Sequence, residues 1–507
     1  AGTWGVCGRG CMNITDENTD DRQWLTLLTI GLLALLLLRL FALGLNQTDL
    51  FFDEAQYWFW SLDPAFGYYS KPPLIAWIIG LTTEVCGLSE FCVRLPSPFM
   101  HTVTAVGVFF IGRQLYDVRT GVIAALAFAT LPGVSLSSGI ISTDVPLLMF
   151  WAIALFAFVR LIQTQETRAW WPALLLGLAF GCGLNAKYAM AWFVLCAVVY
   201  LVMTPERRWL ARDMRLYTAL ALGALMIVPN VLWNLENKFA TLSHTADNAK
   251  WGGPLVHPQK ALEFFGAQFG VFGPILFGAL LVICWRSLRQ RLPEADRLLL
   301  AFSVPVLVAI LIQAFLSRAH ANWAAVAYVA ATVLVIATMI RDVAWPWLKS
   351  SFALHAAVIL LILVGMATAG MVPMPFGGSP FARTLGWEEV ADSVRREVAS
   401  ASARGEPYAA ILSDDRPVTA ELLYYMHGEK TPIYAWSGAG RPRDHFELVR
   451  PYTSAVGDPI LLVTLFGDQT KVPAKFSSAE KIAVKTLPAG VNATRRVVFY
   501  RLSGYKD

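Results

Sequence analysis

The chain has 507 residues, of which 56% are hydrophobic and only 15% are charged, and its mean hydropathy is +0.52. Soluble domains carry about 25% charged residues, so this composition excludes an ordinary soluble protein and indicates a polytopic membrane protein. The small net charge of +5 gives no sign of a nucleic acid partner, because the basic residues lie in separate loops, where they report on topology.

The N-terminal tail, residues 1–23, precedes the first apolar run. Residues 1–11, AGTWGVCGRGC, lie before Met12, which resembles a natural start, so we expect them to be foreign to the fold. The run at 24–45 is long enough to cross a membrane and lacks a small-residue cleavage site. We therefore expect a retained membrane anchor rather than a cleaved signal peptide.

Long apolar segments follow one another as far as residue 373. A transmembrane helix needs about 20 apolar residues, and the segment 72–88 is a weak candidate because it is short and contains Glu84. Residues 24–374 therefore predict a polytopic α-helical membrane domain of about 11–13 transmembrane helices. The eleven stronger candidates are residues 24–45, 95–113, 120–139, 146–162, 170–184, 188–204, 214–233, 264–284, 297–316, 322–341 and 352–373.

Loop charge orients these helices. If 72–88 does not cross, five arginine-containing loops share one side, and the positive-inside rule makes that side cytoplasmic. Residues 72–88 then form an interfacial or re-entrant helix within a long outer loop, 46–94. A second outer loop, 234–263, is expected to cover the site. The five basic loops are residues 113–119, 160–168, 205–215, 285–297 and 341–349.

The tail, residues 375–507, is a different kind of sequence and lies on the outer side in this topology. GWEEVADSVRREVASASARG has the periodicity of an amphipathic helix. YAAILSD and PILLVTLF are typical of buried strands, and RRVVFYRL of a closing strand. The sequence therefore predicts a small soluble α/β domain.

The same topology gathers polar residues at the outer boundary of the membrane, where charges usually face protein or a wet cavity. Several have simpler explanations. Asp53 can cap the helix that follows it, Tyr57 can belong to an interfacial aromatic belt, and Lys187 and Arg318 can reach lipid headgroups. The set consists of Asp53, Glu54, Lys71, Asp144, Lys187, Tyr188, Arg318, His320 and Asn322.

Acids and bases gathered on one face suit transfer of a group from a lipid phosphate. A leaving phosphate requires fixed positive charge, and an attacking hydroxyl requires a carboxylate that accepts its proton. The sequence contains no Walker motif and no G-x-G-x-x-G, so the donor is not expected to be a nucleotide. His244 and His257 do not have a diagnostic metal spacing. We expect no required cofactor, and a divalent metal is not indicated.

Four segments carry a resemblance: FFDEAQYWFW, YYSKPPLIAW, RLPSPFMHTVTAVGVFFIGRQLYDVRTG and STDVPLLMFW. Together they resemble the GT-C glycosyltransferases related to protein O-mannosyltransferases, especially the bacterial lipid A branch of aminoarabinose and galacturonosyl transferases. The similarity is clearest over residues 50–190, and the membrane architecture extends it to about residue 370. The resemblance implies an inverting enzyme of the bacterial inner membrane that moves a single sugar from a polyprenyl-phosphate carrier to lipid A or the lipopolysaccharide core. Its active site and tail domain would be periplasmic.

The resemblance also implies roles for individual residues. Asp53 would be the catalytic base, Glu54 would support it, Lys71 would bind the donor phosphate, and Asp144 would shape the site. By position and charge, we expect Lys187 and Arg318 to share the phosphate. Tyr57, Tyr69, Tyr188 and His320 are the expected substrate contacts, although His320 is equally well explained as a satisfied boundary histidine.

Other interpretations remain open. Ser70 stands where aminoarabinose transferases often place an acid, so a close match to that substrate is doubtful. A protein O-glycosyltransferase of the same fold, a glycan ligase and a lipid-linked glycan transporter are the alternatives. The transporter is disfavoured because the sequence lacks internal duplication and matched broken spans. Cys86 and Cys92 fit either a short disulfide or ordinary buried thiols, and we slightly favour the thiols.

Overall fold

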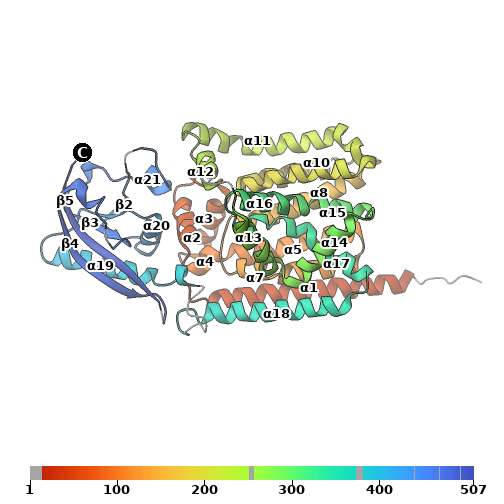
Figure 1. The fold of residues 1–507 in the computed structure, drawn as a ribbon, viewed down its shortest axis with the longest axis horizontal. Helices are drawn as coiled ribbons and strands as arrows, with labels where there is room; N and C mark the ends of the chain where they lie inside the picture. Colours follow the sequence, from red (N-terminus) through yellow and green to blue (C-terminus); the bar gives the residue numbers. More distant parts are fainter. Residues whose placement is uncertain are drawn as a thin grey trace, which may run out of the picture.

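The computed structural model describes residues 14–249, 256–372, 381–438, 440–467, 469–491 and 493–506. A helical bundle and a C-terminal α/β domain lie end to end along the long axis of the molecule (Figure 1). Residues 1–11, residues 250–255 of the predicted covering loop and the predicted boundary at 374–375 lie outside the described residues.

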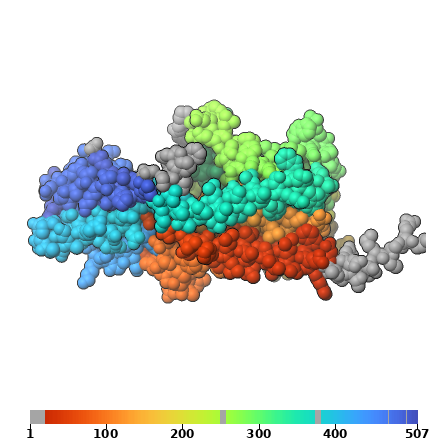
Figure 2. All heavy atoms as spheres, turned by 90° about the horizontal axis from the view of Figure 1, so that it is seen from below, coloured from red at the N-terminus to blue at the C-terminus, as the bar shows by residue number. Residues whose placement is uncertain are grey.

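The bundle confirms a multi-pass helical membrane protein. Within the described residues, six helical segments are long and apolar enough to cross a membrane, or seven if one bent pair counts as a span, and five further apolar helices are shorter. Figure 2 shows α1 and α18 side by side on one face of the bundle. The helices are α1 (Ile14–Gly44), α5 (Pro96–Leu115), α6 (Val118–Thr130), α7 (Pro132–Ser137), α8 (Asp144–Gln163), α9 (Trp171–Ala186), α10 (Trp192–Met203), α11 (Met214–Glu236), α12 (Ala240–Ala249), α13 (Pro258–Phe272), α14 (Pro274–Ser287), α15 (Glu294–Ala301), α16 (Val304–Leu316), α17 (Ala327–Arg341) and α18 (Trp345–Ala367).

Two predicted spans are broken by proline. The predicted helix 120–139 divides at Pro132 into α6 and α7, and the predicted helix 264–284 divides at Pro274 into α13 and α14, which are bent by 117°. Proline lacks the N–H that the helical ladder requires, so it is tolerated at the first position of a new helix but not in the interior. Gly273, with a φ of +87°, supplies the sharp change of direction between α13 and α14.

The first outer loop folds into three short helices between the bundle and the α/β domain: α2 (Phe52–Ser61), α3 (Leu74–Cys86) and α4 (Glu90–Arg94) (Figure 1). At 13 residues, α3 is about 20 Å long, too short for a hydrocarbon core of about 30 Å. Its exposed Trp77, Leu81 and Val85 fit the predicted interfacial helix. Cys86 and Cys92 form a disulfide, so the favoured prediction of two thiols was wrong.

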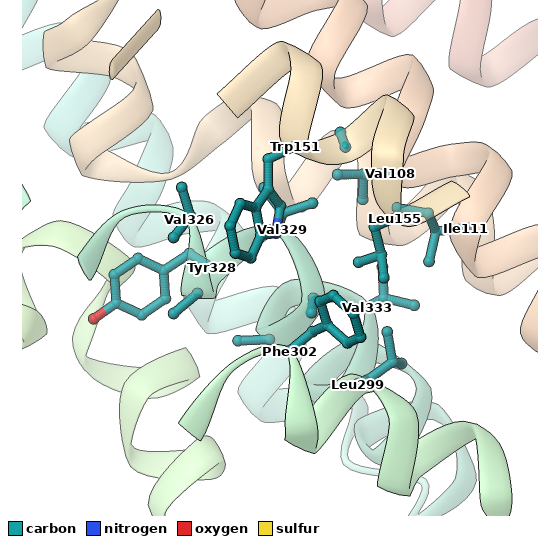
Figure 3. Close-up of a cluster of buried hydrophobic side chains, with 14 of the residues drawn as sticks. Val108, Ile111, Trp151, Leu155, Leu299, Phe302, Val326, Tyr328, Val329 and Val333 are labelled. Carbon is teal, nitrogen blue, oxygen red and sulfur yellow. The ribbon is translucent and has the colours of Figure 1, made fainter. Parts of the chain in front are cut away.

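The core of the bundle is built from large apolar side chains of α5, α8, α15 and α17 (Figure 3). Trp151 of α8 lies 6.3 Å, centroid to centroid, from Phe302, which directly follows α15, and both are fully buried. Small residues of α5 and α6 allow these two helices to approach closely. A Cβ on Gly112 would lie 2.7 Å from Gly121 Cα, so a larger residue at this position would push α5 and α6 apart.

The five basic loops do gather at one end of the bundle, here called the basic end. Arg207 pairs with Glu294 at 2.7 Å and Arg341 pairs with Asp296 at 2.6 Å, which ties together loops far apart in sequence. Arg215 donates to the carbonyl of Thr164 at 2.9 Å and thereby joins two more of these loops. Several arginines of the basic end are thus engaged by carboxylates or carbonyls of neighbouring loops.

The C-terminal domain contains a five-stranded sheet of order β2-β1-β3-β5-β4, in which β1 pairs in parallel with β2 and β3, while β5 runs antiparallel to β3 and β4. The amphipathic helix and the three predicted strands are confirmed as α19, β1, β3 and β5. The elements are α19 (Trp387–Ala403), β1 (Ala410–Ser413), α20 (Arg416–Tyr425), β2 (Ile433–Ala435), α21 (His445–Val449), β3 (Ile460–Thr464), β4 (Phe476–Pro488) and β5 (Thr494–Tyr505).

Candidate active site

Two acids occupy the first turn of α2, where carboxylates interact favourably with the helix dipole. The N-cap residue is Phe51, whose backbone N–H donates to Glu54 Oε2 at 2.9 Å. The alternative that Asp53 caps this helix is therefore wrong. Asp53 is free to point out of the helix, and its side chain is 36% exposed.

Glu54 is enclosed and fully hydrogen-bonded. Its carboxylate accepts from the Arg94 guanidinium, with a shortest N–O distance of 2.8 Å, and from the backbone N–H of Ile141 at 2.8 Å. The side chains of Arg94 and Glu54 are 1% and 2% exposed. Glu54 thus fixes α2 against the end of α4 and the segment before α8. Its carboxylate oxygens are occupied by these donors, which suits the supporting role expected for Glu54 rather than direct contact with a substrate.

Asp53 pairs with a residue that the sequence prediction missed. Arg416, the first residue of α20 in the C-terminal domain, places Nη1 3.0 Å from Asp53 Oδ1. The same Nη1 donates to Gln56 Oε1 at 3.1 Å. Nothing in the local sequence DDRPVT marks this arginine as part of a site in the membrane domain.

Lys71 lies in the turn that precedes α3, where Pro72 and Pro73 restrict the backbone. Burial lowers the pKa of Lys71, as does the neighbouring charge of Lys187, while Asp53 and Asp144 raise it. The charges of these groups affect the pKa of Lys71 because the groups lie near one another. The structure records no ion pair to the Lys71 ammonium among the residues it describes.

Asp144, at the start of α8, is saturated by two donors. Lys187 Nζ lies 2.7 Å from Oδ1, and Asn322 Nδ2 lies 2.7 Å from Oδ2. The Lys187 and Asp144 side chains are only 18% and 10% exposed. With both oxygens engaged, Asp144 holds Lys187 and the segment after α16 in place. This geometry suits a residue that shapes the site.

The three predicted tyrosines have different surroundings. Tyr57 is buried, and burial together with the charge of Asp53 raises its pKa well above the ordinary value. The Tyr69 hydroxyl donates to the carbonyl of Pro442 at 2.7 Å, and therefore contacts the C-terminal domain. Tyr188 donates to Asn230 at 2.6 Å and so fixes α11 beside the site.

Arg318 and His320 follow α16 and complete the predicted set. Arg318 Nη2 donates to Asn248 of α12 at 3.3 Å, while its buried Nε has no recorded partner among the described residues. The pKa of His320 is lowered by burial, then by Arg318 and more weakly by Lys187 and Lys71. The predicted residues therefore lie in one region, here called the site end.

His244 of α12 also faces the site end. Burial, followed by the charges of Lys71 and Arg416, lowers its pKa to about 4, so the imidazole is neutral at pH 7. Its ring lies 5.6 Å from that of Tyr69. In the described part of the chain, no three His, Cys, Asp or Glu residues are grouped so that they could hold a metal ion.

The C-terminal domain forms one wall of the site end. The Tyr424 ring packs edge-on against Trp58 of α2 with centroids 5.0 Å apart. The backbone N–H of Leu50 donates to the Tyr425 hydroxyl at 3.0 Å. On the other side, Arg441 pairs with Asp247 of α12. Four cations and two carboxylates gather where the helical bundle meets the C-terminal domain, and this arrangement is suited to handling an anionic lipid-linked group.

Comparison with known proteins places this geometry in context. The profile of the family described as dolichyl-phosphate-mannose-protein mannosyltransferase matches residues 70–233. Over 439 residues, 86% of this chain and 90% of the relative, the chain is 36% identical to the lipid A galacturonosyltransferase RgtD of Rhizobium johnstonii. It is 32% identical to the undecaprenyl phosphate-alpha-4-amino-4-deoxy-L-arabinose arabinosyl transferase of Pseudomonas aeruginosa, but over only 32% of this chain and 29% of that protein.

Among solved structures, ArnT from Cupriavidus metallidurans bound to undecaprenyl phosphate superposes with a TM-score of 0.63. The match covers 94% of this chain and 98% of ArnT, at 16% sequence identity. At that identity the likeness shows a shared fold, which includes both the helical bundle and the C-terminal domain.

Proposed function

This chain belongs to the GT-C glycosyltransferase family that includes the lipid A galacturonosyltransferase RgtD, and we propose that it moves one sugar from a polyprenyl-phosphate carrier to lipid A or the lipopolysaccharide core. The observation that carries the proposal is Lys71. Its half-buried ammonium is affected by the charges of Asp53 and Asp144 but has no recorded ion pair among the described residues. A cation without a carboxylate partner is suited to bind an anion such as phosphate.

The proposed reaction is a single displacement. The acceptor hydroxyl attacks the anomeric carbon of the sugar, and its proton passes to the carboxylate of Asp53. The bond between that carbon and the phosphate oxygen breaks, and the polyprenyl phosphate leaves with both bonding electrons. Lys71 and Lys187 stabilise the charge that develops on the phosphate. One displacement from the opposite face inverts the anomeric configuration.

Galacturonic acid is the proposed sugar. The relative that matches across most of the chain is named for galacturonosyl transfer, whereas the aminoarabinose transferase matches across a third of it. Ser70 also lacks the negative charge that aminoarabinose transferases often place before the lysine. An undecaprenyl-type carrier is proposed because the aminoarabinose relative is named for undecaprenyl phosphate and solved ArnT holds that lipid.

The proposed orientation rests on the two ends of the bundle. The arginine-rich loops at the basic end favour the cytoplasm, and this supports a periplasmic location for the site end and the C-terminal domain in a bacterium with an inner membrane. Lipid-linked sugars and lipid A both occur on that face, and a donor without a nucleotide suits it. The disulfide between Cys86 and Cys92 agrees with an oxidising compartment.

The test is transfer by the purified full-length enzyme. Undecaprenyl phosphate-galacturonate and lipid A are mixed with wild type, Asp53→Asn or Lys430→Gln, a variant at an exposed lysine of the C-terminal domain. We expect wild type and Lys430→Gln to add one uronic acid to lipid A, and Asp53→Asn to add almost none while remaining folded. An unchanged rate in Asp53→Asn would overturn the assignment of the base. Transfer to protein but not to lipid A would favour a protein O-glycosyltransferase.

A transporter remains the alternative from another class. The described residues contain one strongly bent helix pair, α13 with α14, rather than the matched pair that repeat-built transporters use. Movement of the intact donor across vesicles without any transfer to an acceptor would support the transporter.

A further inference from the structure

The C-terminal domain contributes one side chain directly to the site end. Arg416 is the first residue of α20 and reaches Asp53 and Gln56 of α2. Its position is fixed because α20 is docked on α2 through the rings of Tyr424 and Trp58 and through the Tyr425 hydroxyl. The guanidinium is therefore placed by domain docking rather than by a flexible loop.

Only part of the Arg416 guanidinium is hydrogen-bonded or paired within the described residues. Nη1 contacts Asp53 at 3.0 Å and Gln56 at 3.1 Å, and Cζ lies 4.7 Å from the centre of the Phe52 ring. Among the residues that the structure describes, Nε and Nη2 have no recorded hydrogen bond, and the side chain is 30% exposed. An arginine presents five N–H donors in a planar fork that matches a carboxylate. Arg416 therefore retains a donor edge that can face a ligand.

The charge at the site end exceeds what a lipid phosphate needs. The cations are Lys71, Lys187, Arg318 and Arg416, and the facing carboxylates are Asp53 and Asp144, an excess of two positive charges. A sugar phosphodiester carries one negative charge. Asp444 is engaged within the C-terminal domain, where its Oδ1 accepts from the backbone N–H groups of Phe446 and Glu447, and burial raises the pKa of both Asp444 and Asp415. A donor with a second anionic group would balance the remaining charge.

The positions of the cations separate two tasks. Lys187 Nζ lies 2.7 Å from Asp144 Oδ1, and the charge of Lys187 lowers the pKa of Lys71. The two lysines are suited to one phosphate, whereas Arg416 Nη1 lies 3.0 Å from Asp53 Oδ1. The anomeric carbon must lie next to the acceptor hydroxyl that Asp53 deprotonates, so the rest of the same sugar ring lies near Arg416.

We propose that Arg416 binds the carboxylate of a uronic acid donor and so determines the sugar specificity of the enzyme. This inference rests on the proposed function and adds the group that selects the sugar. Binding engages the open Nε and Nη2 edge while Nη1 remains on Asp53. A neutral hexose leaves that edge unpaired in a partly enclosed site, and an unpaired polar group is costly.

The experiment compares two donors that differ only at C6, undecaprenyl phosphate-galacturonate and undecaprenyl phosphate-galactose. For wild type, Arg416→Gln, Arg416→Lys and Lys430→Gln, kcat/KM is measured with each donor and the ratio is taken. We expect wild type to prefer the uronate donor and Arg416→Gln to lower the ratio by roughly ten- to a hundredfold. Arg416→Lys should give an intermediate ratio because it keeps the charge but loses the fork. Lys430→Gln should leave the ratio unchanged.

The ratio distinguishes specificity from positioning. If Arg416 acts only by orienting Asp53, both donors slow by the same factor and the ratio stays at the wild-type value, which overturns the inference. If wild type uses both donors equally, the inference also fails while the proposed function stands. If wild type transfers neither sugar, the proposed function itself fails.

Discussion

The two ends of the helical bundle handle charge in opposite ways. At the basic end, Arg207 and Arg341 each have a carboxylate partner within 2.7 Å, and neighbouring loops are tied together by these pairs. At the site end, Lys71 is half-buried and has no recorded ion pair among the described residues, although two carboxylates act on its pKa. The paired arginines of the basic end join loops to one another. The Lys71 ammonium, by contrast, is available to an anionic ligand, which supports the proposed function.

The difference lies in how each carboxylate is used. Glu54 and Asp144 also lie at the site end, yet both are saturated by donors and fix helices in place. Asp53 differs because its side chain is 36% exposed and has a single recorded ionic partner. Burial and saturation therefore support the proposal that Asp53, rather than Glu54 or Asp144, accepts the proton of the acceptor hydroxyl.

The largest effect is expected from Asp53→Asn. Asparagine keeps the shape of the side chain but does not accept a proton, so the transfer rate should fall by roughly 10²–10⁴-fold. The melting temperature should change little because Asp53 is partly exposed. The measurement is single-turnover transfer beside a thermal melt. A large drop in melting temperature with an unchanged rate would show that Asp53 is structural, like the acids of the basic end.

The second-largest effect is expected from Lys71→Met. The transfer rate should fall by roughly 10²–10³-fold because the leaving phosphate loses a charged donor. Lys71→Arg keeps the charge and is the matched control, which should retain more activity. Binding of undecaprenyl phosphate, measured by calorimetry, should weaken in Lys71→Met. Equal binding by wild type and Lys71→Met would contradict the assignment of Lys71 to the phosphate.

Glu54→Gln tests the saturated acids. It leaves the Arg94 guanidinium buried without a compensating charge, which should lower the free energy of unfolding by about 3–5 kcal/mol. Chemical denaturation in detergent measures the free energy of unfolding, and Lys430→Gln, at an exposed lysine, is the control. A loss of activity without any loss of stability would restore Glu54 to a catalytic role.

A lower pH should weaken the packing of the C-terminal domain against α2. Burial lowers the pKa of His445 to about 3, and its ring packs 5.4 Å from that of Trp60 in α2. The folded pKa of His445 lies below the unfolded value of about 6.5. The contribution of the neutral imidazole to the free energy of unfolding is therefore fully present above pH 6.5 and is lost as pH falls. Between pH 6.5 and 5, the loss should approach roughly 2 kcal/mol.

His445→Phe isolates this contribution to the free energy of unfolding. The comparison is needed because burial raises the pKa of Asp49 to about 6, which favours folding as pH falls over the same range. Melts of both proteins at pH 6.5 and pH 5 give the difference. If the stability of the two proteins depends on pH in the same way, His445 does not contribute to the loss of stability in acid.

The smallest effect is expected at the basic end. The side chains of the Arg207–Glu294 pair are 30% and 36% exposed, so Arg207→Gln should lower the free energy of unfolding by about 1 kcal/mol or less. Transfer activity should stay at the wild-type level. A strong loss of activity would show that the two ends are coupled and would weaken the contrast between them.

Much of the bundle could be predicted because apolar runs of membrane length have few other structures available. The break at Gly273 and Pro274 was missed, although that dipeptide is a recognised breaker signal. The strand β4 was also missed. It lies at the sheet edge, its residues are mostly exposed, and an exposed edge strand lacks the apolar alternation that marks a buried one.

The site was predictable where the polar residues stand at the ends of apolar segments. Asp53, Lys71, Asp144 and Lys187 stand out because charge is costly at a membrane boundary. Arg416 could not be found in this way, because it lies in a soluble domain where arginine is common. It reaches Gln56 from 360 positions away, and only the docking of the two domains makes that contact.

The most direct test of the central claim is mass spectrometry of lipid A from cells that carry either wild type or Asp53→Asn at matched protein levels. The account predicts a species heavier by one uronic acid with wild type and its loss with Asp53→Asn. Identical lipid A profiles in the two strains would contradict it.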